Sequence, residues 1–101
     1  MNKVTYEERR VTYKAAIRKF GVDSQCLKAI EEMSELTKEL CKISFGKGDM
    51  ENLADEIADV TIMLEQLRLI YDLNDKVCEH MDYKVKRLQS RVGMVEISNA
   101  K

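Results

Sequence analysis

The chain has 101 residues, of which 45% are hydrophobic and 35% charged, and its net charge is −1. The length predicts one domain over residues 1–101, and the balance of apolar and charged residues argues against a disordered chain or a membrane protein. The near-zero net charge gives no reason to expect binding to nucleic acid or to an anionic membrane.

The first half of the chain is predicted to form two amphipathic helices. The sequence has no proline and only four glycines, so long helices are expected throughout. Apolar residues at helical spacing indicate a first helix that ends at Gly21, and Asp23 or Ser24 is expected to cap the second. The apolar stripe of the second helix, expected to face the core, consists of Cys26, Ile30, Met33, Leu36, Leu40 and Ile43.

The second half is predicted to form two more helices. The segment "SFGKGD" interrupts the pattern with two glycines, and Asp49 is expected to cap a third helix from about Met50 to Tyr71. After "DLN", Asn74 is the expected cap of a fourth helix, and residues 95–101 are expected to be a frayed tail. Joins this short imply antiparallel neighbours, so the predicted fold is an all-α, antiparallel four-helix bundle.

The third helix is apolar on two opposite sides. A helix with this pattern is expected to be buried on both sides, and so short a chain has a limited core of its own. Assembly through this helix into a homo-dimer or homo-tetramer is therefore predicted. The two stripes are Leu53, Ile57, Val60, Leu64 and Leu67, expected to face the core of the subunit, and Ala54, Ala58, Ile62 and Leu69 opposite them.

The cysteines and the N-terminus both favour a cytoplasmic protein. Cys26, Cys41 and Cys78 form no C-x-x-C pair, so they are expected to be reduced and to serve as small core residues. The first residues, "MNKVTYEERR", lack the apolar segment of a signal peptide, and no apolar run is long enough for a membrane span.

Two pairs of acids lie beside the apolar stripes of the second and third helices. Glu32 and Glu35 are three residues apart, as are Glu56 and Asp59, so the members of each pair are neighbours on one flank of a helix. Two antiparallel helices can bring these four carboxylates together, and such a cluster needs a cation. Carboxylate oxygens suit Mg²⁺ or Mn²⁺, and Mg²⁺ sites are commonly completed by phosphates of a substrate. The alternative is that E-x-x-E forms an ordinary solvated face, paired with nearby lysines.

The acidic segments resemble a known family. "EEMSE" (31–35) followed by "EIAD" (56–59) is similar to the E-E-x-x-E … E-x-x-D pattern of MazG-like nucleoside triphosphate pyrophosphohydrolases, in the all-α NTP pyrophosphatase superfamily. The resemblance extends over about residues 20–92. It implies a dimer or dimer of dimers that uses Mg²⁺ to hydrolyse a nucleoside or deoxynucleoside triphosphate to the monophosphate and pyrophosphate, in house-cleaning of the nucleotide pool.

The resemblance also implies roles for individual residues. Glu32, Glu35, Glu56 and Asp59 match the metal ligands, whereas Glu31, which points about 100° away from Glu32 around the helix axis, is left outside that set. One carboxylate that is not fully engaged with metal can take a proton from the attacking water. Glu35 is our choice for this catalytic base, although nothing in the sequence distinguishes it from Glu32.

Basic residues of the fourth helix are candidates for binding the triphosphate. His80, Lys84, Arg87 and Arg91 recur along one flank, and Lys84 and Arg91 lie closest to the apolar stripe. Lys47, in the glycine loop, is a further candidate. For each of these cations the alternative is a solvated surface residue, and a lone histidine such as His80 is more often structural.

The aromatic residues and the overall function leave alternatives open. Tyr6, Tyr13 and Phe20 lie at seven-residue spacing on the first helix, where they are expected in the core or, alternatively, stacked on a nucleobase. The alternative to an enzyme is a non-catalytic helical module that binds metal for structure or interaction. A di-iron bundle is disfavoured, because such proteins use Glu-x-x-His pairs and Val77 precedes His80 at that position.

Overall fold

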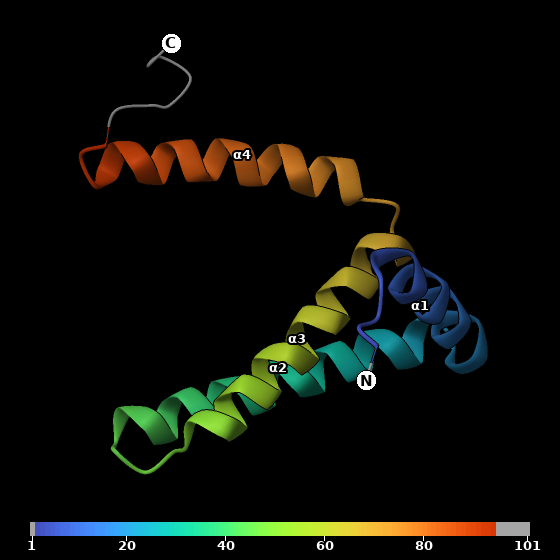
Figure 1. The fold of residues 1–101 in the computed structure, drawn as a ribbon, viewed down its shortest axis with the longest axis horizontal. Coiled ribbons are helices and arrows are strands. Elements are labelled where there is room, and N and C mark those ends of the chain that lie inside the picture. Colours follow the sequence, from blue (N-terminus) through green and yellow to red (C-terminus); the bar gives the residue numbers. More distant parts are fainter. Residues whose placement is uncertain (1, 95–101) are drawn as a thin grey trace. The chain divides into compact units, whose positions relative to one another are not determined.

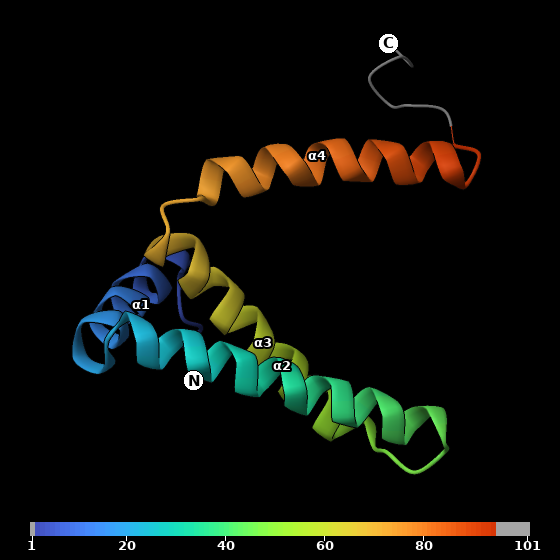
Figure 2. The same cartoon turned by 180° about the vertical axis from the view of Figure 1, so that it is seen from behind.

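The protein is helical in the part of the chain that its computed structural model describes, residues 2–94 (Figures 1 and 2). No strand occurs in this range, so the predicted all-α class with four helices is confirmed. None of these helices is long and apolar enough to cross a membrane. The predicted frayed tail, residues 95–101, lies outside the described residues. The helices are α1 (Tyr6–Phe20), α2 (Val22–Ser44), α3 (Met50–Ile70) and α4 (Asn74–Arg91).

The four helices fall into two compact units. The first ends at Tyr71 and contains α1, α2 and α3, and the second begins at Asp72 and contains α4. In the first unit α2 and α3 lie side by side as an antiparallel hairpin, and α1 contacts both of them. This packing agrees with the helical-bundle class predicted from the short connections. A single domain over residues 1–101 stays a prediction.

The helix start at Asp49 is confirmed, and it follows from local chemistry. The Asp49 Oδ1 accepts a hydrogen bond of 2.8 Å from the Asn52 backbone N–H, which satisfies one of the free N–H groups of the first turn of α3. A second cap, which the sequence reading missed, begins α1. There Thr5 and Glu8 form a reciprocal capping box, with hydrogen bonds of 3.0 and 3.2 Å.

Two predicted caps are wrong. The second helix begins at Val22 rather than after Asp23 or Ser24, because Gly21 serves both as the end of α1 and as the start of α2. Its φ of 90° is accessible to glycine and joins the two helices through one residue, and glycine has no side chain that could form a cap. The last helix already includes Asn74, and Leu73 occupies its cap position.

The faces that α2 and α3 turn toward each other differ from the predicted apolar stripes. The fully buried residues are Gln25, Ala29 and Glu39 on α2, and Val60, Met63 and Gln66 on α3. By contrast Ile30, Leu40, Ile57 and Leu64 are 59, 50, 48 and 46% exposed in the single chain. The predicted burial is therefore confirmed for Val60, whereas these four residues are not covered within the first unit. Apolar spacing identifies a face that needs cover, but it does not identify the element that covers it.

The first helix is held against α3 by one buried tyrosine. Tyr13 is buried and its hydroxyl donates to Glu65, whose Oε1 also lies 3.9 Å from Arg9 Nε. Burial, and next the hydrogen bond to Glu65, raise the pKa of Tyr13 to about 12. The expected core position is thus confirmed for Tyr13, whereas Tyr6 and Phe20 are each 56% exposed and do not belong to the core.

The cysteines do not form part of the core as predicted. Cys41 and Cys78 are exposed, and Cys26 is half-buried with its Sγ 3.4 Å from the Tyr71 hydroxyl. All three are free thiols, as expected. A cysteine is small enough to be accepted on either side of an amphipathic helix, so its type alone did not decide its burial.

Candidate metal centre

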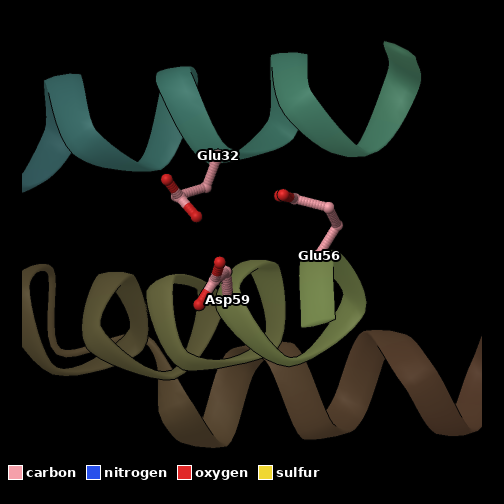
Figure 3. Close-up of side chains that lie close together, drawn as sticks. All are labelled: Glu32, Glu56 and Asp59. Carbon is pink, nitrogen blue, oxygen red and sulfur yellow. The ribbon is translucent and has the colours of Figure 1, made fainter. Parts of the chain in front are cut away.

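Three carboxylates from two helices converge between α2 and α3 (Figure 3). Glu32 extends from α2, and Glu56 and Asp59 extend toward it from α3. One oxygen from each of the three side chains lies within 4.8 Å of the others, and all three residues are half-buried. The structure therefore brings together three of the four acids predicted as metal ligands.

The packing of the hairpin explains why these acids meet. On α2, residues 25, 29, 32, 36 and 39 follow an alternating four–three spacing and share one face. Ala29, which is 1% exposed, is small and allows α3 to approach closely at this level. On α3, Glu56 lies on the same side as the buried Val60 and Met63. The acids therefore occupy positions that a helical hairpin ordinarily fills with apolar side chains.

The carboxylates raise one another's pKa values. The pKa of Glu32 is raised first by a hydrogen bond with Asp59, then by burial and by the charges of Asp59 and Glu56, while Lys28 opposes the shift. The pKa of Glu56 is raised first by burial and then by the charges of its acidic neighbours, with Asp59 the strongest. Both shifts disfavour the charged form, so the nearby charge of Lys28 does not fully offset the repulsion among the acids.

Two carboxylate oxygens in this region are buried without a hydrogen-bond partner. These atoms are Glu56 Oε2 and Glu39 Oε1. Glu39 is only 7% exposed, and its other oxygen lies 3.5 Å from Lys42 Nζ. Leaving a buried acceptor without a hydrogen bond is unfavourable. Hard oxygen donors with unused lone pairs are the ligands that Mg²⁺ prefers, so the residues present fit such an ion.

Glu35 lies outside the cluster of three oxygens. It is exposed on α2, although its charge contributes to the raised pKa of Glu56. Glu31 is also exposed and pairs with Lys28 at 3.4 Å, which agrees with its exclusion from the predicted ligand set. The predicted role of Glu35 as a direct ligand is therefore not reproduced in the cluster.

Two residues of α2 near the acids, Lys28 and Glu39, were not predicted as part of the site, although pairing of the E-x-x-E acids with nearby lysines was the stated alternative. Lys28 Nζ lies 3.6 Å from Glu32 Oε1, one turn away on the same helix. Glu39 is buried on the α2 face that carries Glu32. The available signals were the i, i+4 spacing of Lys28 and Glu32 and the seven-residue spacing of Glu32 and Glu39.

The other predicted substrate contacts are not brought to the acids within the first unit. Lys47 is exposed in the loop between α2 and α3, beyond the end of α2 and more than three turns of that helix from Glu32. Lys84, Arg87 and Arg91 are exposed on α4, in the second unit, and the Arg87 guanidinium lies 5.7 Å from the centre of the Tyr83 ring. Their approach to the acids stays a prediction, and His80 is likewise exposed on α4.

Known proteins provide no further guide. No protein-family model, no curated protein and no solved structure matches the chain.

Proposed function

We propose that this protein hydrolyses a nucleoside or deoxynucleoside triphosphate to the monophosphate and pyrophosphate with Mg²⁺, as its resemblance to MazG-like enzymes implies. The observation that supports this most strongly is the convergence of Glu32, Glu56 and Asp59 within 4.8 Å. The unpartnered oxygen of Glu56 adds to it, because an acid of a purely structural hairpin would be expected to find a donor. House-cleaning of the nucleotide pool is the corresponding cellular role.

In this proposal the acids divide into two roles. Glu32, Glu56 and Asp59 hold the cation, and Mn²⁺ is a plausible substitute because it shares the preference for oxygen ligands. When bound, Mg²⁺ neutralises phosphate charge and lowers the pKa of water. Glu35, exposed beside the cluster, accepts the proton of the attacking water as general base. Its solvent exposure and its position outside the three-oxygen group suit a residue that must exchange protons.

A screen for pyrophosphate release tests the proposal against the non-catalytic alternative. Each common nucleoside triphosphate, in ribose and deoxyribose form, is incubated with the protein and Mg²⁺, and released pyrophosphate is measured. We expect turnover of at least one nucleotide that stops when EDTA is added. Binding of Mg²⁺ without turnover of any nucleotide would support the metal-binding module instead.

Lys28 is expected to contribute to substrate affinity rather than to turnover. It lies beside Glu32 and carries the charge that a phosphate group requires. Phosphate is charged both before and during the reaction, so this contact is uniform between ground and transition states. For Lys28→Ala we expect KM to rise about fivefold with kcat changed by less than about twofold, as for loss of one exposed phosphate contact.

The matched control for Lys28 is Lys38→Ala, an exposed lysine on the same helix. Steady-state kinetics of both variants should separate them, with the control close to the wild type. Equal changes of KM in the two variants would mean that Lys28 acts only through the general surface charge and does not contact the substrate. A loss of kcat with an unchanged KM would contradict its assignment to affinity.

The exposed apolar faces of α2 and α3 support self-association of the chain. Ile30 and Leu40 on α2 and Ile57 and Leu64 on α3 are between 46 and 59% exposed in the single chain. Apolar surface on this scale marks an interface, and the described chain has few buried apolar residues of its own. The proposed assembly is a homo-dimer or homo-tetramer in which a second copy covers these faces.

Light scattering at micromolar concentration tests this assembly. We expect a mass of at least two chains, and we expect Leu64→Glu to shift it toward the 11.7 kDa monomer. Val11→Glu is the control, because Val11 is equally apolar and 65% exposed but lies on α1. A monodisperse monomer of the unmodified chain would contradict the assembly.

A further inference from the structure

A groove opens directly beside the acid cluster. It has a volume of about 780 Å³, and Glu32 and Asp59 form part of its wall together with Lys28. Away from the acids its wall is largely apolar, with contributions from Leu27, Ile62 and Met63, and Phe20 also lines it. A concave, mainly apolar site with a few polar groups is the usual form of a small-molecule site.

Two buried amides, together with the Ser24 side chain, line the end of this groove that lies away from the acids. Gln25 Nε2 donates to Gln66 Oε1 at 2.7 Å, and the two residues are 7 and 5% exposed. The Gln66 amide nitrogen otherwise faces the Met63 sulfur at 3.9 Å, which is a weak acceptor. Two apolar side chains would fill these positions without any need for hydrogen bonds. The amide pair therefore places hydrogen-bonding groups in a largely apolar wall, and the Gln66 N–H there meets only a weak acceptor.

Phe20 gives the groove an exposed aromatic surface. It ends α1, is 56% exposed although it is large and apolar, and Lys19 Nζ lies 5.6 Å from the centre of its ring. Stacking on an exposed aromatic ring is the usual way in which proteins hold an unpaired base. Lys19 adds positive charge beside this ring.

The order of these groups along α2 matches the order of groups in a nucleotide. Gln25 comes first, Lys28 follows one turn later, and Glu32 lies about 10 Å along the axis from Gln25. The groove thus has an amide-and-aromatic end, a cation in the middle and a carboxylate cluster at the other end. Glutamine amides pair with the edges of bases, as in the bidentate contact with adenine.

We infer that this groove binds the nucleobase of the triphosphate, with Phe20 stacked on the base and the Gln25–Gln66 pair reading its edge. The inference rests on the proposed function, since it assigns the base end of the same substrate. It makes Gln25 and Gln66 determinants of base preference, and it separates the affinity for the base from the affinity for the phosphates.

A fluorescent reporter tests the stacking part. The sequence contains no tryptophan and two phenylalanines, so Phe20→Trp and Phe45→Trp each introduce a single fluorophore. Phe45 is the matched control because it is 79% exposed at the start of the loop between α2 and α3. The probes are the α,β-methylene analogues of dATP, dGTP, dCTP and dTTP with Mg²⁺, in which the bond proposed to be cleaved is blocked. We expect saturable quenching in Phe20→Trp and little change in Phe45→Trp.

Inorganic tripolyphosphate, which has no base, distinguishes a failure of the groove assignment from a failure of the proposed function. We expect Phe20→Ala to weaken binding of the preferred analogue about tenfold, while calorimetry gives tripolyphosphate an unchanged Kd. If tripolyphosphate binds with Mg²⁺ but no analogue quenches Phe20→Trp more than Phe45→Trp, the groove assignment is overturned and the proposed function stands. If neither tripolyphosphate nor any analogue binds the wild-type chain, the proposed function fails, and the groove assignment fails with it.

The double variant Gln25→Leu/Gln66→Leu tests the reading of the base. Both partners are replaced together, so no buried amide is left unpaired and the helices should remain folded, as circular dichroism can check. In the wild type we expect Kd values for the four analogues to differ by at least about tenfold, from one good amide–base contact. In the double variant this spread should fall to about threefold or less. A wild type without base preference, or a double variant that keeps the full preference, would overturn the role of the amides.

Discussion

Replacing Glu56 with glutamine is expected to reduce pyrophosphate release by a factor of about 100–1,000, the range for loss of one preorganised electrostatic contact to the transition state. Glu56 is one of the three acids that meet within 4.8 Å, and one of its oxygens is buried without a partner. A neutral amide has nearly the same shape but holds a cation far more weakly. Asp59→Asn should have an effect of the same order. The measurement is kcat/KM for the best nucleotide found in the screen.

Two features separate this result from simple misfolding. Glu56→Gln removes a charge that burial and neighbouring acids disfavour, so the metal-free variant should be at least as stable as the wild type. Glu51→Gln, an exposed acid in the first turn of the same helix, is the control and should keep nearly full activity. A Glu56→Gln variant that is folded and within about threefold of wild-type activity would contradict the assignment of these acids.

The metal-free protein is expected to lose stability as the pH rises, and Mg²⁺ is expected to restore it. The pKa values of Glu32 and Glu56 are raised above the ordinary value of 4.5. The folded state therefore binds protons more tightly than the unfolded state at these groups. Their contribution to stability is fully present below about pH 4.5 and is lost as the pH rises through the raised values. At neutral pH, Mg²⁺ bound as proposed would take the place of these protons.

Thermal unfolding at a series of pH values measures this linkage. At a Mg²⁺ concentration ten times its Kd, the gain of about 1.4 kcal/mol should raise Tm by roughly 5–10 °C at pH 7. The shift with K⁺ at matched ionic strength should be much smaller. Glu56→Gln should lose most of the Mg²⁺-specific shift and should show a flatter fall of metal-free stability with pH. Equal responses to the two salts would mean that ordinary screening, rather than a site, accounts for the effect.

The helix boundaries could largely be predicted, because they depend on a few neighbouring residues. The cap at Asp49 and the break at Gly21 follow from side-chain oxygen chemistry and from glycine geometry. The failures at Asp23 and Asn74 have the same local origin. A residue with a good capping side chain starts a helix only if the residue before it is not already helical. Val22 is already helical before Asp23, because Gly21 ends α1 and α2 begins at the next residue.

The buried face of each helix could not be predicted, because it depends on which other element packs against the helix, and the spacing of apolar residues does not identify that element. Ile30 and Leu64 follow apolar spacing but remain about half exposed, whereas Glu39 is buried. A chain that assembles with another copy has two kinds of covered face, one inside the subunit and one between subunits. Under the proposed assembly the acids would occupy the first kind of face, and the exposed members of the apolar stripes, such as Ile30 and Leu64, would occupy the second.

The candidate site was predicted in part, and helix geometry accounts for the difference. Three residues advance a helix by about 300°, so Glu35 lies about 60° around the axis from Glu32, whereas Glu39 lies only about 20° away. Glu39 therefore shares the face toward α3, and Glu35 remains exposed beside it. The motif spacing identified the region of α2 that contributes to the acid cluster, but it did not show which acids of that region face α3.

Identification of the products by ³¹P nuclear magnetic resonance tests the central proposal most directly. The wild-type chain and Mg²⁺ are incubated with the nucleotide that gives the highest turnover, with no added pyrophosphatase, and the phosphorus signals are followed over time. The expected products are the nucleoside monophosphate and pyrophosphate in equal amounts, appearing together. Orthophosphate with a nucleoside diphosphate as the initial products would contradict cleavage between the α and β phosphates.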